Sequence, residues 1–206
     1  MLNSIRTLIL ALWIVALFAG LTAGAETAQK GSLEQYFQKA RQEYLQKDLK
    51  AAADEVHKAA AYLKSEAAAA KGKGKEALTA SYREMEKLSD ELKKGTVKSV
   101  KEIEMAFARA YNALATNSHV KSAEAWSKKE VQKAGEELDS AAEALGKAYT
   151  WAGQEVKAGT QKVISDAKEL SRKLKEGAHQ ASADAGKALK DLGQEIKAFG
   201  QKISSK

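Results

Sequence analysis

Histidines are the side chains best suited to chemistry in this chain, because it contains no cysteine. Glu176 and His179 have Glu-x-x-His spacing, which can place two metal ligands on one helix face; Asp54 and His57 have the same spacing with Asp in place of Glu. Ligands of this kind must project into a bundle core. Both pairs lie opposite the apolar residues of their own segments and are expected to be solvated. The sequence therefore predicts no metal site, and a helical-bundle metal protein is the third functional hypothesis.

Motifs for covalent or phosphoryl chemistry are missing from the chain. It has no cysteine nucleophile, no Gly-x-Ser-x-Gly and no phosphate-binding glycine loop. Residues 71–75 alternate lysine and glycine without a following Ser or Thr, which predicts a flexible basic linker. Carboxylates are spread over polar helical positions with lysines nearby, a pattern typical of solubility and side-chain pairing. We expect no enzyme activity, no catalytic residue and no cofactor.

The N-terminal segment has the three parts of an export signal. Arg6 precedes an apolar run over residues 8–18, and Ala23 and Ala25 form an A-x-A cleavage site. An uncleaved membrane anchor is the alternative, but the run is short of the ~20 apolar residues that span a bilayer. We expect cleavage before Glu26, no transmembrane segment afterwards, and a periplasmic or secreted mature protein.

The charge balance indicates which partners the chain can bind. The whole chain carries +7, of which Arg6 contributes one, and residues 152–206 contain 11 basic and 7 acidic side chains. A basic exported protein can bind anionic lipid, cell-envelope polymer or an acidic protein partner. Nucleic acid is not expected, because dense arginine clusters and stacking aromatics are missing.

Helical spacing of apolar residues dominates residues 26–151, and the chain contains no proline. A capping box predicts that the first helix begins at Ser32. The spacing slips by one residue at Leu49, which predicts two antiparallel helices joined by a tight turn, with a single bent helix as the alternative. A third helix ends at Gly95. A fourth follows and is expected to weaken near Asn117. These residues predict a body of four or five antiparallel helices.

An internal repeat appears when the chain is shifted by 82 residues. The matched pairs are Tyr44 and Trp126, Lys47 and Lys129, Asp48 and Glu130, Leu49 and Val131, Ala52 and Ala134, Glu55 and Glu137, Val56 and Leu138, Ala59 and Ala141, and Leu63 and Leu145. The shared order is a bulky aromatic, a polar turn, then small and large apolar residues at fixed offsets. This pattern resembles the helical hairpins of tetratricopeptide-type repeats, although 82 is not a multiple of their 34-residue period. The sequence predicts a duplicated helical hairpin.

Residues 152–206 have an apolar stripe with an 11-residue period. The stripe is a candidate amphipathic binding face made of Val163, Leu170, Leu174, Leu192, Ile196, Phe199 and Ile203. This period keeps one straight stripe along a helix and resembles the amphipathic repeats of exchangeable apolipoproteins and late-embryogenesis-abundant stress proteins. Gly186, Gly193 and Gly200 recur every seven residues beside it, which either loosens the helix or lets another backbone approach.

Together these patterns predict an all-α protein: an antiparallel bundle of hairpins over 26–151 and a long C-terminal amphipathic helix over 152–206. The first functional hypothesis is an exported, non-enzymatic protein that binds partners or surfaces through amphipathic helices, with protection under stress as one use. The second is an apolipoprotein-like carrier of lipid or another apolar ligand. The stripe can pack on the body, on a membrane or on another chain. Packing on the body is favoured, because the body is poor in large apolar residues.

Overall fold

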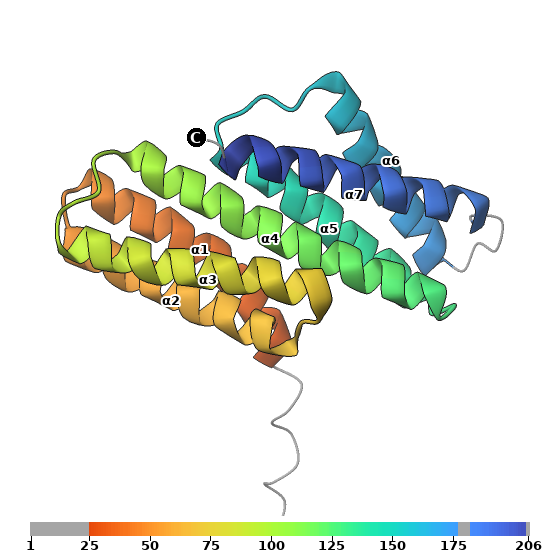
Figure 1. Cartoon of the computed structure of the whole chain (residues 1–206), viewed down its shortest axis with the longest axis horizontal. Coiled ribbons are helices and arrows are strands. Elements are labelled where there is room, and N and C mark those ends of the chain that lie inside the picture. The colour runs from red at the N-terminus through yellow and green to blue at the C-terminus, as the bar shows by residue number, and fades with distance from the viewer. Residues whose placement is uncertain (1–24, 177–181, 205–206) are drawn as a thin grey trace, which may run out of the picture.

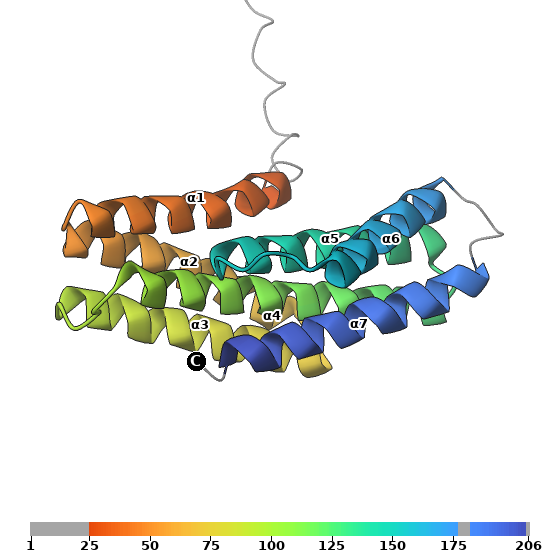
Figure 2. The same ribbon diagram turned by 90° about the horizontal axis from the view of Figure 1, so that it is seen from above.

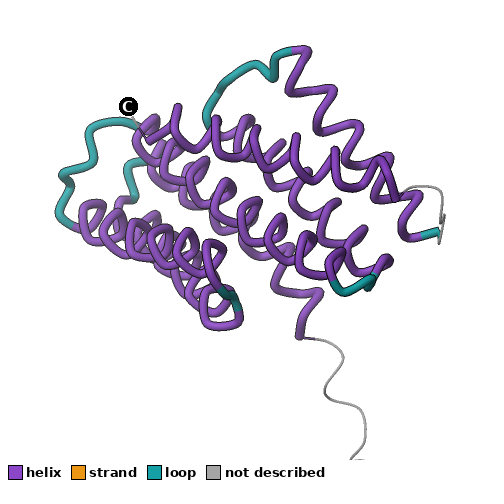
Figure 3. The backbone as a smooth tube through the Cα atoms, turned by 45° about the vertical axis from the view of Figure 1, so that its right-hand side comes forward, coloured by secondary structure: helices purple, strands orange, loops and turns teal. Residues whose placement is uncertain are grey.

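The computed structural model describes residues 25–176 and 182–204, and the side chains of 33–176 and 184–204. These residues form seven α-helices and no strand. Figure 3 shows the helices in purple and the connections between them in teal. The helices are α1 (Ala25–Leu45), α2 (Leu49–Ala69), α3 (Gly72–Lys93), α4 (Val100–Ser127), α5 (Val131–Trp151), α6 (Ala158–Lys175) and α7 (Ser182–Ser204). The all-α helical-bundle fold predicted from the sequence is confirmed.

The helices form two four-helix groups that share α4 (Figure 1). In the first group, α1, α2 and α3 pack in order and α3 packs on α4. In the second, α4, α5, α6 and α7 pack in the same order, and α7 returns to α4. Figure 2 shows α4 and α5 in the middle of the molecule, with α1 on one side and α7 on the other. Buried residues from all seven helices belong to one continuous core.

The C-terminal segment is a hairpin rather than the single long helix that the stripe predicted. α6 ends at Lys175, α7 begins at Ser182, and the two helices pack against each other. One straight helix of this length would leave much of its apolar stripe in solvent. Two shorter helices let both halves of the stripe pack on α4 and α5, so burial overrides the continuous period.

Three local predictions differ from the structure. α1 begins at Ala25, so Ser32 lies inside the helix and is not its N-cap. α4 runs unbroken past Asn117, which is buried. Residues 71–75 are not a linker, because α3 begins at Gly72 and Gly74 is buried against Asn117; a Cβ at Gly74 would lie 2.5 Å from the Asn117 side-chain oxygen. Close packing of the two helices therefore accounts for both the glycine and the asparagine.

The two turns matched by the 82-residue shift have the same geometry. Lys47 and Lys129 both have positive φ, 67° and 61°, in the left-handed region that favours glycine. The N–H of Asp48 donates to the Glu43 carbonyl and that of Glu130 to the Ala125 carbonyl, the long bond of a Schellman motif in each turn. These bonds confirm that residues 45–49 and 127–131 are tight turns between antiparallel helices.

Buried serines extend the repeat beyond the hairpin. Ser89 of α3 donates to the Ala53 carbonyl at 2.9 Å, and Ser171 of α6 donates to the Gly135 carbonyl at 2.7 Å. Both members of the second pair lie 82 residues after those of the first. The structure therefore repeats a four-helix unit in which α4 supplies the last helix of the first copy and the first helix of the second.

Candidate functional site

The predicted amphipathic binding face lies inside the molecule. Six of its residues are buried: Leu170, Leu174, Leu192, Ile196, Phe199 and Ile203; Val163 is half-buried against the same core. The stripe therefore packs on the body, which is the outcome that the sequence analysis favoured over packing on a membrane or on another chain. In this folded form the face is covered by α4 and α5 and is not open to a partner.

A partly buried polar contact joins the C-terminal hairpin to α5. The Glu195 carboxylate of α7 accepts hydrogen bonds from Tyr149 of α5 and Thr160 of α6, both at 2.7 Å. Burial, with the Glu195 hydrogen bond, raises the pKa of the Tyr149 phenol to about 12. Tyr149 also packs on Phe199, with ring centroids 4.0 Å apart. These contacts fix α6 and α7 relative to α5.

Two glycines of α7 allow its close approach to α4. A Cβ at Gly193 would lie 2.7 Å from the His119 ring, and one at Gly200 would lie 2.7 Å from the Asn112 amide nitrogen. The His119 Nε2 is also 2.8 Å from the Leu189 carbonyl oxygen of α7. At both positions the close neighbours are side chains of α4 rather than its backbone, whereas a Cβ at Gly186 would meet no atom within 4 Å. His119 therefore has a packing role between helices.

An aromatic cluster lies where the two four-helix groups meet. Phe37 of α1 stacks on Phe107 of α4 with ring centroids 3.9 Å apart, and Trp151 of α5 meets Phe107 edge-on at 5.1 Å. The Glu34 carboxylate accepts hydrogen bonds from Tyr111 and, at 3.4 Å, from the Trp151 indole. Burial, with the Glu34 hydrogen bond, raises the pKa of Tyr111. The cluster anchors α1 to both α4 and α5.

The carboxylate–histidine pairs do not converge on a metal site in the described residues. Asp54, His57 and Glu176 are exposed, and His179 lies outside the described residues. In residues 33–176 and 184–204, no group of three or more Asp, Glu or His side chains has metal-binding geometry. The metal-protein hypothesis receives no geometric support from these side chains.

Two small cavities lie beside α7. The first, about 210 Å³, lies between α6 and α7, and its charged lining consists of Asp166, Glu169, Lys173, Asp184, Lys187 and Asp191. The second, about 190 Å³, lies between α3, α4 and α7; the buried Ser81 hydroxyl and Asn112 side-chain oxygen line it without a hydrogen-bond partner. Both fall below the ~300 Å³ typical of ligand pockets.

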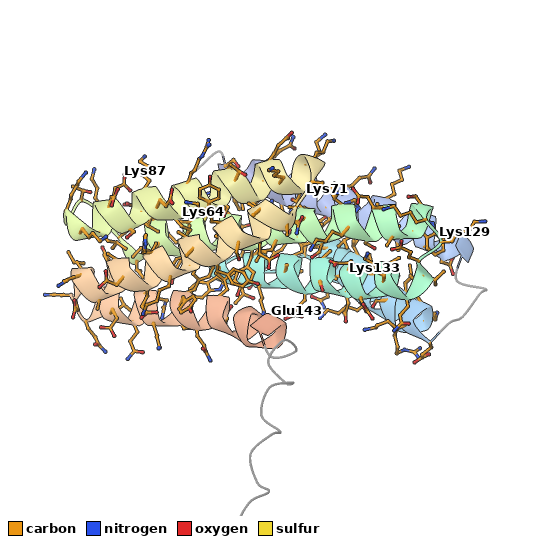
Figure 4. All side chains as sticks on the ribbon, turned by 90° about the horizontal axis from the view of Figure 1, so that it is seen from below. Lys64, Lys71, Lys87, Lys129, Lys133 and Glu143 are labelled. Carbon is orange, nitrogen blue, oxygen red and sulfur yellow. The ribbon has the colours of Figure 1, made fainter. Side chains whose placement is uncertain are left out.

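Charge dominates the outer surface. Figure 4 labels five lysines spread along the molecule, from Lys87 near one end to Lys129 near the other. Many carboxylates pair with neighbouring lysines, as Glu143 does with Lys147 at 3.0 Å. In the described part of the chain, no helix combines the length and apolar character needed to span a membrane.

The predicted cleavage site lies largely outside the described side chains. Ala23 is outside the described residues. Ala25 and Glu26 lie in the first turn of α1, and their side chains are not described. Cleavage before Glu26 therefore stays a prediction.

The sequence analysis did not predict the structural roles of several residues. Lys47 and Lys129 carried no sign of positive φ, since glycine is the usual signal for it. Ser89 and Ser171 could have been found by extending the 82-residue comparison into α3 and α6. The short contact between Gly74 and Asn117 had no sequence signal.

The fold defines an all-α protein of two four-helix units built on one shared helix. Comparisons of the chain with protein-family models, curated proteins and solved structures find no match.

Proposed function

We propose that this chain is an exported, non-enzymatic helical protein that binds an anionic surface of the cell envelope in its folded state. The observation that carries the proposal is where the apolar residues lie. The stripes of the helices, including the face over Val163–Ile203, pack into one core. What the folded molecule offers a partner is therefore its charged exterior, which has an excess of lysine.

The sign of that charge favours an anionic partner. The chain carries +7, and removal of the leader with Arg6 leaves +6. Basic proteins concentrate at anionic surfaces, and the attraction weakens as salt shortens its range, to about 10 Å at 0.1 M. Anionic lipid and acidic cell-envelope polymers share this chemistry. The proposal therefore replaces binding through apolar helix faces with binding through outer lysines.

The test uses mature protein beginning at Glu26, with export checked by N-terminal sequencing. Binding is measured to vesicles of phosphatidylglycerol and phosphatidylcholine in equal parts, to phosphatidylcholine alone, and to a soluble polyanion such as a teichoic-acid polymer. We expect binding to at least one anionic target, loss of binding at high salt, and no change in helix content. Binding to none of the anionic targets would overturn the proposal.

An apolar-ligand carrier is the second candidate, and one feature favours it. The buried stripe belongs to a single hairpin, α6–α7, which joins the rest through the one connection from Trp151 to Ala158. Movement of this hairpin would uncover the stripe while α1, α2 and α3 keep their packing on one another. This function predicts saturable uptake of a fluorescent fatty acid by the folded protein, whereas a surface-binding protein shows none.

A further inference from the structure

One end of the molecule is made by two connections that pack together. These are the α1–α2 turn (residues 45–49) and the α3–α4 connection (residues 94–99), seen at the left of Figure 1. The Tyr44 hydroxyl donates to the Val97 carbonyl at 3.2 Å. The Leu49 side chain reaches Gly95, where a Cβ would lie 3.7 Å from it. We call this end, with the helix residues beside it, the basic tip.

An exposed leucine lies on the basic tip. Leu45, 54% exposed, is the one exposed large apolar residue among the described side chains. The second copy of the same turn shows that the backbone does not require a leucine there. The equivalent position, 82 residues later, is Ser127, and the two turns share their hydrogen bonds and positive φ. Leu45 therefore adds apolar surface that the fold does not use.

Lysines surround this leucine. The basic tip carries five exposed lysines: Lys47, Lys50, Lys93, Lys94 and Lys98. In the part of the chain that the structure describes, none of the five pairs with a carboxylate. In the second copy, the equivalents of Lys93 and Lys94 are Lys175, which pairs with Asp139 at 3.0 Å, and Glu176. Unpaired lysine is thus a property of the first copy at positions 93 and 94, whereas Lys129, the equivalent of Lys47, is also an exposed lysine.

Carboxylates at the same end offset the lysines only in part. Asp48 and Glu102 turn back to backbone N–H groups at the starts of α2 and α4, where the helix dipole offsets their charge. Glu91 pairs with Lys87 at 3.5 Å. Glu43 and Asp90 are the other two carboxylates at this end. Lysine side chains are longer than those of Glu and Asp, so the lysine ammonium groups extend further into solvent. The outermost layer of the tip is therefore positive.

We propose that the basic tip is the contact with an anionic lipid bilayer, with Leu45 entering the headgroup region and the five lysines binding lipid phosphates. This inference rests on the proposed function and names its site and its surface. Lipid is favoured over a soluble polyanionic polymer because a bilayer offers an apolar interior beside its anionic groups and the polymer does not. Interfacial binding combines these two contributions, apolar burial and attraction to anionic lipid.

The test compares matched variants of the mature protein. The tip variant carries Lys50→Gln, Lys94→Gln and Lys98→Gln. The control carries Lys71→Gln, Lys73→Gln and Lys75→Gln, an equal loss of charge at the other end of α2, about 30 Å away. Binding to the phosphatidylglycerol–phosphatidylcholine vesicles is measured by sedimentation. We expect the tip variant to bind about 100-fold more weakly, about five-fold for each lysine, and the control less than ten-fold more weakly.

Leu45 is tested separately. Leu45→Ser reproduces the residue of the second turn, so it should leave the melting temperature unchanged while weakening vesicle binding about ten-fold. The chain contains no cysteine, so Leu45→Cys gives a single site for an environment-sensitive dye, with Ser127→Cys as the control. We expect a blue shift on anionic vesicles for the dye at position 45 only.

The outcomes separate the inference from the proposed function. Equal losses in the tip and control variants, or no blue shift at position 45, would overturn the basic tip while binding to anionic surfaces stands. Binding to the teichoic-acid polymer but not to vesicles would also overturn the tip alone. Binding to neither would overturn both.

Discussion

Three glycines of α7 at seven-residue spacing provide a sharp test of how this helix packs on α4. Replacing a glycine in a helix interior by alanine stabilises the folded protein by about 1 kcal/mol when the added Cβ meets no other atom. A Cβ at Gly186 meets no atom within 4 Å, whereas one at Gly193 would lie 2.7 Å from the His119 ring. Gly186→Ala should therefore raise stability by up to about 1 kcal/mol.

Gly193→Ala should lower stability instead. Overpacking costs about 1–3 kcal/mol, and moving the His119 ring removes its contact with the Leu189 carbonyl, about 1 kcal/mol more. The better helix propensity of alanine offsets about 1 kcal/mol of this cost. The free energy of unfolding should therefore fall by about 1–3 kcal/mol, which lowers the melting temperature by roughly 2–12 °C for a chain of this size.

The free energy of unfolding of each variant is measured by thermal and by urea unfolding, followed by circular dichroism. Adding His119→Ala to Gly193→Ala removes the clash and should recover part of the loss. If Gly193→Ala stabilises the protein as much as Gly186→Ala, α7 does not approach α4 as closely as the structure has it.

Three further predictions follow from single contacts. Lys47→Gly and Lys129→Gly should each stabilise by about 1 kcal/mol in thermal unfolding, because both backbones are left-handed; destabilisation by either would contradict that conformation. Ser89→Ala and Ser171→Ala should each cost about 1 kcal/mol in urea unfolding, and clearly unequal costs would argue against equivalent positions. The pKa of the Tyr149 phenol is about 10 in the unfolded chain and about 12 in the folded protein, so its contribution to folding stability is present below pH 10 and lost between pH 10 and 12. Tyr149→Phe should therefore reduce the fall in stability over that pH range. An unchanged slope of stability against pH would refute the raised pKa of Tyr149.

Periodic features of the fold were predictable from the sequence. The phase slip at Leu49 located a real turn, because a helix cannot change its apolar face without a break. The 82-residue comparison located the second turn, and Val56 and Leu138, matched by that shift, are both fully buried. Gly95 has the left-handed backbone expected of a helix-ending glycine, with φ 67°.

Features that depend on a neighbouring helix were not predictable. The pair of glycines at 72 and 74 indicates a weak helix when read alone, but Gly74 is needed for contact with α4. The stripe over Val163–Ile203 has the period of one long helix, but packing on α4 and α5 favours two. The basic tip had no sequence signal, because its lysines come from segments about 45 residues apart that meet only after folding.

The shared helix α4 also sets the relative orientation of the two four-helix units. Each residue of a helix advances about 1.5 Å and turns about 100°. One residue inserted near the middle of α4, between Tyr111 and His119, would rotate the second unit by about 100° around the helix axis. Such a rotation would separate Trp151 from Phe107 and from Glu34, although neither unit had lost a residue of its own. The number of residues in α4 therefore fixes the angle between the two four-helix units.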